Sequence, residues 1–402
     1  MSTLTAEKLA QATDLVARAG VDVWLTFVRE SATGGDPVLP LIADVGLVWQ
    51  SALLVSAGDE RIAVVGTYDA EPLESSGNWT RVVPYDEDMR EPLLEALEAL
   101  IGPDVVSPRI AVNYSENDVM ADGLSHGMWL LLQNYLEGTR FADALESAEP
   151  IVGALRAGKT GTELHRIRVA IQTTNTHFER ILDFTKVGLT ERAIYEFAQD
   201  WIDEQDLGYA WDRAGNPIVN SGPDSMIGHG LPSTTITVQP GHILHFDLGI
   251  KEDGYCSDMQ RCWYVPHEGE TEAPEDVKRA LDAVNAAITA AAELLRPGVV
   301  GWEVDAAARE SIVASGYPEY KHAVGHQVGR SAHDGGTALA PRWARYGQVP
   351  FGVVGRDEVY TLELGVVVEG RGYLGIEEMV WVTMDGIEWL SDRQLDMPLL
   401  GR

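Results

Sequence analysis

The chain of 402 residues is longer than a single hydrophobic core usually supports, so its length favours two domains. Its 62 acidic side chains outnumber the 30 basic ones, and the net charge of -32 argues against nucleic-acid or anionic-membrane partners because like charges repel. Neither a run of about 18 apolar residues nor a basic-then-apolar leader is visible, so we expect no membrane span and a cytoplasmic protein.

The first 150 residues alternate helical and strand-like patterns. Amphipathic helices are expected over 9–19 and 91–101, and apolar strands over 23–27, 47–55 and 62–65. This alternation predicts an α/β domain. The region lacks clustered His, Cys or paired carboxylates in its sequence, so we expect the chemistry to lie further along the chain.

The pattern changes near residue 155, where we place the boundary between domains of 1–155 and 156–402. Helices are expected next, over about 163–183 and 190–206, then a strand-rich block over 218–264, helices over about 274–295 and 303–314, and a final glycine-rich strand block. Because strands and helices fall in separate runs, the second domain is predicted to be α+β with a mainly antiparallel sheet.

The first informative stretch covers residues 241–265 and contains two alternating segments around an Asp-Gly pair at 253–254. Such a pair is a strong signal for a two-residue hairpin turn. The resulting register sets Gly249 opposite Asp258 and places Asp247 diagonally from Asp258, with Cα atoms about 7 to 8 Å apart. Both carboxylates could then reach cations between them, and we expect the glycine to leave room for an ion.

The second stretch, residues 359–383, folds back around Gly370 and would set Glu363 opposite Glu377. Like charges facing each other across two strands are destabilising, and apolar neighbours strengthen their repulsion. A shared pair of metal ions would remove the conflict, because hard cations accept carboxylate oxygens.

The third stretch, HAVGHQVGRSAHDGG, holds His322, His326 and His333. Glycines on both sides of the middle histidine argue against a helix, so a zinc-protease type of helical histidine pair is not expected. Extended or looped backbone would let one imidazole bind a metal while another faces substrate. Taken alone, the first stretch could be a solvated turn, the second a misjudged strand register and the third a surface loop. Their order within one domain indicates a metal centre.

Taken in order, the residues resemble the pita-bread metallopeptidases, the family of methionine aminopeptidase, aminopeptidase P and prolidase. The family pattern is an Asp, a second Asp 11 residues later, a His in a GHxxG context, and a Glu in each of two late strands. The residues here that match it are Asp247, Asp258, His326, Glu363 and Glu377.

The resemblance implies a pita-bread catalytic domain over about 156–402, preceded by a smaller creatinase-N-like α/β domain. It also implies that the five matching residues bind two divalent ions, Mn²⁺ first, with Co²⁺ or Zn²⁺ as alternatives. A hydroxide bridging the ions would attack the substrate, and Glu363 would carry its proton to the leaving amine. His229 and His333 match family histidines that steady the substrate carbonyl and oxyanion, and His322 matches one near the substrate.

Departures from the family bear on the substrate. Arginine usually stands two positions before the last Glu, where this chain has Gly375, and Gln260 and Leu364 replace a threonine and a proline. The missing arginine removes a rigid partner for a carboxylate, so recognition of a dipeptide C-terminus does not follow from the resemblance. Three arginines are candidates to compensate: Arg342, Arg345 and Arg371.

The resemblance implies a homodimer and an exopeptidase that cleaves Xaa-Pro bonds in small peptides, as a dipeptidase or an aminopeptidase; the net charge predicts no nucleic-acid or membrane partners. An alternative is a metal-dependent hydrolase of the same fold that acts on a non-proline amide, such as a cyclic compatible solute. A further alternative, from another class, is a non-catalytic binding protein, which the retained ligands argue against.

Overall fold

The computed structural model describes residues 3–228 and 230–401, and the chain separates into two compact units between Thr162 and Glu163. Helix α7 (Glu149–Ala157) belongs to the first unit, because its Ile151 and Leu155 side chains are part of that unit's core. The division therefore follows this helix, whereas the boundary inferred near residue 155 lies inside it.

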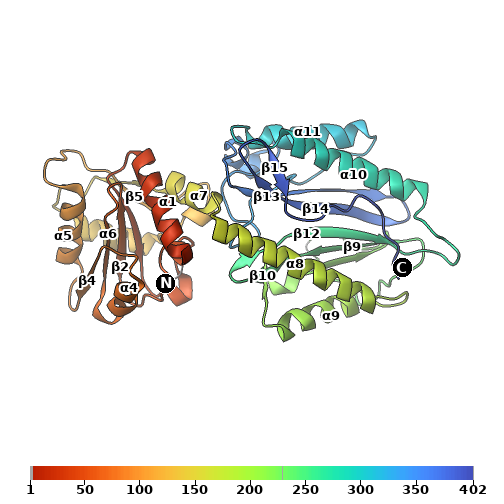
Figure 1. The fold of residues 1–402 in the computed structure, drawn as a ribbon, viewed down its shortest axis with the longest axis horizontal. Coiled ribbons are helices and arrows are strands. Elements are labelled where there is room, and N and C mark those ends of the chain that lie inside the picture. The colour runs from red at the N-terminus through yellow and green to blue at the C-terminus, as the bar shows by residue number, and fades with distance from the viewer. Residues whose placement is uncertain (1–2, 229, 402) are drawn as a thin grey trace. The chain divides into compact units, whose positions relative to one another are not determined.

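The first unit is built on a six-stranded mixed sheet with the order β4-β3-β2-β1-β5-β6 (Figure 1). Central strand β1 (Val23–Val28) pairs antiparallel with β2 (Ser51–Ser56) and parallel with β5 (Ile110–Val112). The other strands are β3 (Arg61–Gly66), β4 (Arg81–Tyr85) and β6 (Leu145–Ser147). The helices are α1 (Thr3–Ala19), α2 (Ser31–Gly34), α3 (Leu39–Ile42), α4 (Ala70–Ser76), α5 (Arg90–Ile101) and α6 (His126–Leu136), with 3-10 turns η1 (Thr67–Asp69) and η2 (Val119–Ala121).

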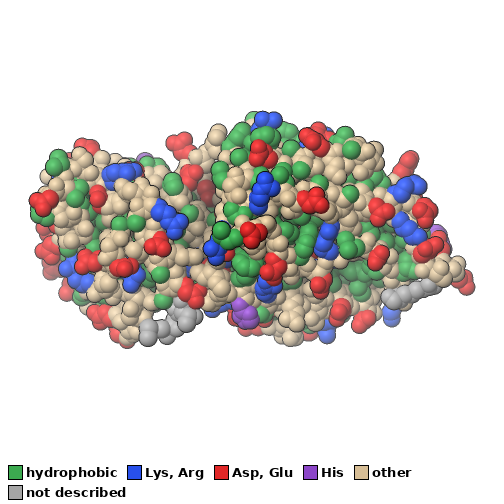
Figure 2. Space-filling view, turned by 45° about the horizontal axis from the view of Figure 1, so that its top comes forward, with side chains coloured by type: hydrophobic (Ala, Val, Ile, Leu, Met, Phe, Trp, Pro, Cys, Tyr) green, Lys and Arg blue, Asp and Glu red, His purple; other side chains and the backbone are tan. Residues whose placement is uncertain are grey.

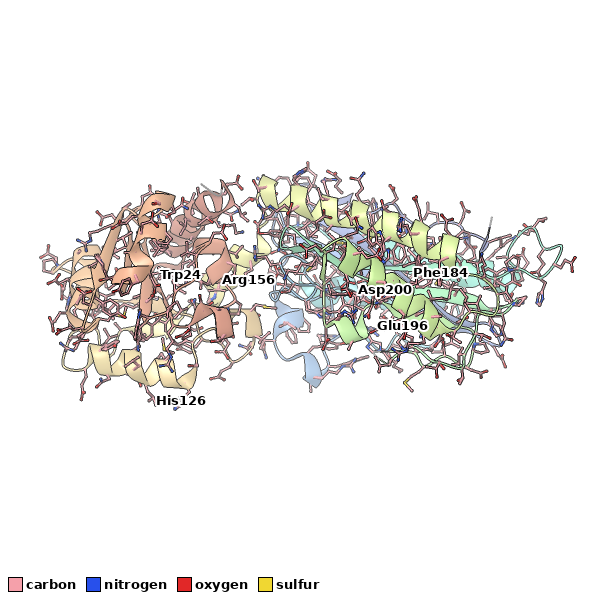
Figure 3. The ribbon with its side chains drawn as sticks, turned by 90° about the horizontal axis from the view of Figure 1, so that it is seen from below. Trp24, His126, Arg156, Phe184, Glu196 and Asp200 are labelled. Atoms are coloured by element: carbon pink, nitrogen blue, oxygen red, sulfur yellow. The ribbon has the colours of Figure 1, made fainter. Side chains whose placement is uncertain are left out.

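Both faces of this sheet are covered, so β1 is buried along its whole length. Successive side chains of a strand point to opposite faces. Trp24, labelled in Figure 3, packs in the core with α1 and α7, and Leu25 packs in the core with α5 and α6. The helices on each side therefore explain why this strand is a continuous apolar run in the sequence.

The second unit begins with α8 (Gly161–Phe184) and α9 (Glu191–Glu204) and contains three small antiparallel sheets. One has the order β12-β9-β8, from β8 (Ile218–Ser221), β9 (Ile243–Leu248) and β12 (Met259–Tyr264). The second has the order β11-β10-β7, from β7 (Gly208–Tyr209), β10 (Ile250–Glu252) and β11 (Tyr255–Cys256). The third has the order β13-β14-β15, from β13 (Val359–Val368), β14 (Gly372–Val382) and β15 (Ile387–Trp389). The remaining elements are α10 (Glu275–Leu294), α11 (Gly301–Ala314) and the turns η3 (Arg213–Gly215), η4 (Ala344–Tyr346) and η5 (Val349–Phe351).

In the second unit the strands lie between the α10–α11 pair and the α8–α9 pair (Figure 1). Phe184, at the end of α8, stacks on Phe197 of α9 with ring centroids 4.0 Å apart, while Glu196 and Asp200 lie on the exposed side of α9 (Figure 3). The separate runs of helices and antiparallel strands agree with the α+β architecture expected from the sequence.

The core under α10 decides which way the late strands face. Leu362 and Leu364 of β13 and Ile376 of β14 pack in the cluster that includes the buried side of α10. Because side chains alternate along a strand, the odd-numbered positions of β13 and β14, including both late glutamates, point to the opposite face.

Within the described residues, helices long and apolar enough to cross a membrane are absent. Figure 2 shows acidic side chains scattered over the visible face, as the net charge of -32 requires.

Candidate metal centre

The two late glutamates face each other on neighbouring strands. The β13–β14 hairpin turns at Gly370, whose φ is +72°, and pairs Glu363 directly with Glu377, so the predicted register is confirmed. Leu362 and Ile376, beside them, are fully buried on the other face. The pairing thus brings two carboxylates together next to an apolar core, where the low dielectric constant makes their repulsion large.

The two aspartates come from the other hairpin. Its turn has positive φ at Asp253 and Gly254, 48° and 79°, as a type I′ turn requires, and Asp247 faces Gln260 as the Asp-Gly register predicts. Asp258 immediately precedes β12. The same face of the β9–β12 pair therefore presents both aspartates.

The expectation that Gly249 leaves room for an ion is wrong. A Cβ on this residue would lie 2.4 Å from Trp211 Cζ3 and 2.6 Å from both Ala210 Cβ and the Ser257 carbonyl oxygen. The glycine instead allows the chain to pass close to the Trp211 ring, at the point where the hairpin leaves the β9–β12 sheet for the β10–β11 sheet.

The histidine loop is extended and lies beside β13. Glu363 N donates to the Val324 carbonyl at 2.7 Å, and Thr361 N donates to the His326 carbonyl at 2.9 Å. Gly325 makes this approach feasible, since a Cβ there would lie 2.1 Å from the Thr361 carbonyl oxygen. The prediction that this segment is not helical is confirmed, and the backbone pairing sets His326 next to Glu363.

The imidazole of His326 points its Nε2 atom at three carboxylates. Its Nδ1 lies 3.0 Å from the Ala332 carbonyl, which assigns the N–H to Nδ1 and leaves the Nε2 lone pair free to bind a metal. Nε2 lies 3.7 Å from Asp258 Oδ2, 3.6 Å from Glu363 Oε1 and 3.8 Å from Glu377 Oε1. Ligand atoms of Asp258, His326 and Glu377 all fall within 4.8 Å of one another.

The mutual repulsion of the buried carboxylates in this cluster favours the binding of cations. Burial raises the pKa of Asp247, Asp258, Glu363 and Glu377, and repulsion from Asp247 adds to the rise at the other three. Asp247 Oδ1 is buried, and within residues 3–228 and 230–401 it has no hydrogen-bond partner. Burial and the nearby His333 lower the pKa of His326 to about 3, so the imidazole is neutral. Clustered carboxylates with an orphaned oxygen and one neutral imidazole fit a divalent metal site.

The other histidines are placed as follows. The His333 ring lies 4.3 Å from the His326 ring, centroid to centroid, and the His322 ring lies 5.6 Å from that of Tyr320. His229 lies outside the described residues.

Two tyrosines also lie near the carboxylates. The side chains of Tyr320 and Tyr373 are hydrogen-bonded to each other, and the pKa of Tyr373 is raised first by burial and then by the nearby Glu363. These tyrosines, which the sequence did not single out, belong to the surroundings of the carboxylates.

None of the three arginines proposed to compensate for Gly375 is among the nearest neighbours of that residue. A Cβ on Gly375 would meet Gln260 Oε1 and Tyr373 Cε1 at 2.6 Å and His245 Nε2 at 2.9 Å. Each arginine contacts other groups: Arg371 donates to Asp276, Arg342 lies over the Trp302 ring, and Arg345 donates to the Lys321 carbonyl and the Tyr346 hydroxyl.

Gln260 is a polar partner of the cluster whose role the sequence did not reveal. Its Nε2 donates to Glu363 Oε2 at 3.0 Å and to Glu377 Oε2 at 3.1 Å, and its Oε1 lies 3.1 Å from His245 Nε2. The strand register alone placed Gln260 opposite Asp247, which signals proximity to the cluster but does not indicate which way the amide points.

Comparison with known proteins gives consistent results. Residues 165–384 match the sequence pattern of metallopeptidase family M24. The Xaa-Pro dipeptidase of Lactobacillus helveticus is 28% identical over 291 residues, which cover 69% of this chain and 71% of that protein.

Two solved structures share the fold over nearly the whole chain. The dipeptidase PepE from Mycobacterium ulcerans superposes with a TM-score of 0.74 at 22% identity, covering 99% of this chain and 98% of that one. The Xaa-Pro dipeptidase from Bacillus anthracis superposes with a TM-score of 0.73 at 22% identity, covering 98% and 100%. The expected fold, a pita-bread α+β domain with a smaller α/β N-terminal domain, is confirmed.

Proposed function

The chain belongs to metallopeptidase family M24, and on that premise we propose that it is an exopeptidase that hydrolyses Xaa-Pro peptide bonds, as a dipeptidase or an aminopeptidase. The observation that carries the proposal is the approach of Asp258, Glu363 and Glu377 to one neutral imidazole nitrogen of His326, within 3.8 Å in each case. The likeness to an Xaa-Pro dipeptidase supports the choice of bond.

The proposed ligands are Asp247, Asp258, His326, Glu363 and Glu377. Four carboxylates carry a charge of -4 when ionised, which two divalent ions would neutralise. Mn²⁺ is our first choice, because oxygen-rich sites with one imidazole suit it, and Co²⁺ or Zn²⁺ would also fit. Bound there, the ions would lower the pKa of a water molecule until it serves as the nucleophile, and would polarise the scissile carbonyl.

The protein's own groups would manage protons and charge. We assign Glu363, from family resemblance, the transfer of a proton from the attacking water to the leaving amine; its Oε1 lies inside the cluster, 3.6 Å from His326 Nε2. His333, beside His326, would donate a hydrogen bond to the oxygen that becomes negative in the transition state. We assign His229 the same kind of role from family resemblance alone, and His322 a contact with the substrate.

A panel of peptides tests the proposal. Metal-stripped protein is resupplied with Mn²⁺ and given Ala-Pro, a longer Xaa-Pro peptide, and matched proline-free peptides. We expect hydrolysis of Xaa-Pro substrates only, and the two lengths separate a dipeptidase from an aminopeptidase. If Mn²⁺, Co²⁺ and Zn²⁺ each fail to support turnover of either Xaa-Pro substrate, the proposal is wrong. Hydrolysis of a proline-free amide instead would point to the alternative small-molecule hydrolase.

We also propose that the protein is a homodimer in the cytoplasm, without nucleic-acid or membrane partners. The net charge of -32 supports the last two points, because it repels polyanions. Light scattering coupled to gel filtration should give twice the chain mass of 43.8 kDa, and a monomer would contradict the proposed assembly.

A further inference from the structure

Gln260 is tied to both late glutamates through a single amide nitrogen. Its Nε2 donates to Glu363 Oε2 and Glu377 Oε2 at 3.0 and 3.1 Å. The other oxygen of each glutamate, Oε1, is the one that lies 3.6 and 3.8 Å from His326 Nε2. The amide thus holds one oxygen of each carboxylate and leaves the second turned toward the imidazole.

The orientation of this amide is set by a buried chain of polar groups. Gln260 Oε1 lies 3.1 Å from His245 Nε2, His245 Nδ1 lies 3.1 Å from Asn220 Oδ1, and Asn220 Nδ2 donates to the Met226 carbonyl at 2.9 Å. The side chains of Gln260, His245 and Asn220 are almost fully buried, with exposures of 3 to 5%. A flipped Gln260 amide would aim its oxygen at two carboxylates, so the observed orientation is the one that the contacts allow.

Gly375 provides the space that this arrangement needs. Its φ lies outside the left-handed region, so the backbone there does not demand glycine. A Cβ would nevertheless lie 2.6 Å from Gln260 Oε1 and 2.9 Å from His245 Nε2. Glycine at position 375 therefore leaves the space that the Gln260–His245 pair occupies.

We propose that Gln260, oriented by His245 and Asn220, is a positioning residue that sets Glu363 and Glu377 for metal binding, and that Gly375 is glycine in order to admit it. The inference rests on the proposed metal centre. A neutral amide suits this place because it satisfies one oxygen of each glutamate without cancelling the negative charge that attracts the ions, as a cationic side chain would.

The test is the affinity of the full-length, metal-free protein for Mn²⁺, measured by calorimetry well below its unfolding temperature. Gln260→Met keeps the length of the side chain and removes the amide, and we expect affinity to fall about ten- to a hundredfold, the usual effect of losing a partner that orients metal ligands. Gln199→Met is the matched control. Its buried amide donates to the Arg213 and Asn216 carbonyls instead of to a carboxylate of the cluster, and affinity should stay within threefold of wild type.

A double-mutant comparison tests the role of Gly375. Gly375→Ala should weaken Mn²⁺ binding in the wild type by displacing the Gln260 amide, and should cost much less in a Gln260→Ala background, where the amide is already gone. An equal loss in both backgrounds would show that Gly375 acts independently of Gln260 and would overturn that part of the inference.

The outcomes separate this inference from the proposed function. If wild-type protein binds Mn²⁺ and Gln260→Met binds it equally well, the positioning role is wrong while the metal centre stands. If the wild type binds neither Mn²⁺ nor Co²⁺ nor Zn²⁺, both are wrong. A fall in affinity that the Gln199→Met control shares would mean that loss of any buried amide loosens the domain, which would also overturn the inference.

Discussion

Each of the two units buries acidic side chains, but the two sites differ in how many carboxylates they hold and in how many hydrogen bonds those carboxylates accept. In the N-terminal unit, Asp36 is 3% exposed, and its carboxylate accepts hydrogen bonds from Val38 N at 2.9 Å and Asn113 Nδ2 at 2.7 Å. Asn113 in turn accepts from Trp24 Nε1 at 2.6 Å (Figure 3 labels Trp24). In the C-terminal unit, four carboxylates share a few donors, and no residue that the structure describes donates to Asp247 Oδ1.

The two sites require different kinds of partner. A lone buried carboxylate can be accommodated by neutral donors, and the pKa of Asp36 rises only to about 6 because those hydrogen bonds partly offset its burial. Four carboxylates in one buried cluster repel each other beyond what an amide and an imidazole can offset. The first arrangement is therefore complete as part of a fold, whereas the second is suited to receive cations.

The largest expected effect comes from neutralising one acid of the cluster. Asp258→Asn or Glu363→Gln should lower the rate of Xaa-Pro hydrolysis at least a thousandfold, because each removes a proposed metal ligand. Steady-state assays with Mn²⁺ supplied measure the loss, and circular dichroism checks that the fold is kept. Activity within about tenfold of the parent would contradict the assignment.

The pH dependence of stability should distinguish the two acidic sites. A carboxyl whose pKa is raised by folding stabilises the protein below its ordinary pKa, and that contribution is lost as pH rises through the folded value. For Asp36 this window runs from 3.8 to about 6 and corresponds to about 3 kcal/mol. Burial raises the pKa of Asp247 to about 7 and of Glu363 to about 8, so their window extends higher.

Urea unfolding of the metal-free protein, followed from pH 4 to pH 9, measures these windows. We expect stability to fall with rising pH. Asp36→Asn should reduce the slope below pH 6, and Glu363→Gln should reduce it above. A slope above pH 6 that Glu363→Gln leaves unchanged would mean that its carboxyl does not titrate as its burial requires.

Metal should stabilise the protein through one site only. At a free Mn²⁺ concentration a hundred times the dissociation constant, binding to the folded state alone adds about 2.7 kcal/mol. Thermal unfolding with and without Mn²⁺ should show the upward shift in wild type and in Asp36→Asn, and lose it in Asp258→Asn. A shift that Asp258→Asn retains would place the ion elsewhere.

The smallest effects are expected at two glycines that abut these sites. A Cβ at Gly123 would lie 2.1 Å from Asp36 Cγ, and one at Gly325 would lie 2.1 Å from the Thr361 carbonyl oxygen. Each alanine substitution should cost about 1–3 kcal/mol of stability through overpacking. Only Gly325→Ala should also weaken Mn²⁺ binding, because it displaces the backbone of His326; calorimetry that finds equal affinities for both variants would refute this distinction.

Local pattern in the sequence accounts for much of this site, and long-range pairing accounts for the rest. The turns at Gly370 and at residues 253–254 fix which residues of the two strands face each other. Because side chains alternate between the two faces of a strand, this register predicts which carboxylates share a face. The approach of the His326 segment to β13 depends on backbone pairing between distant parts of the chain. Such pairing cannot be predicted by counting residues outward from a turn, as the two hairpin registers can. The Trp211 ring that fills the space beside Gly249 is likewise a tertiary contact.

The hydrogen bonds between the His326 segment and β13 have a consequence for how the protein matures. Val324 and Glu363 are joined by a backbone bond across 39 positions, and Glu377 takes its place only when β14 has paired with β13. The proposed metal ligands therefore meet only after β13 and β14 have paired. In the proposed metal centre, a chain that folds without metal should already hold these ligands together, so metal scarcity should yield folded protein that binds Mn²⁺ when it is added later.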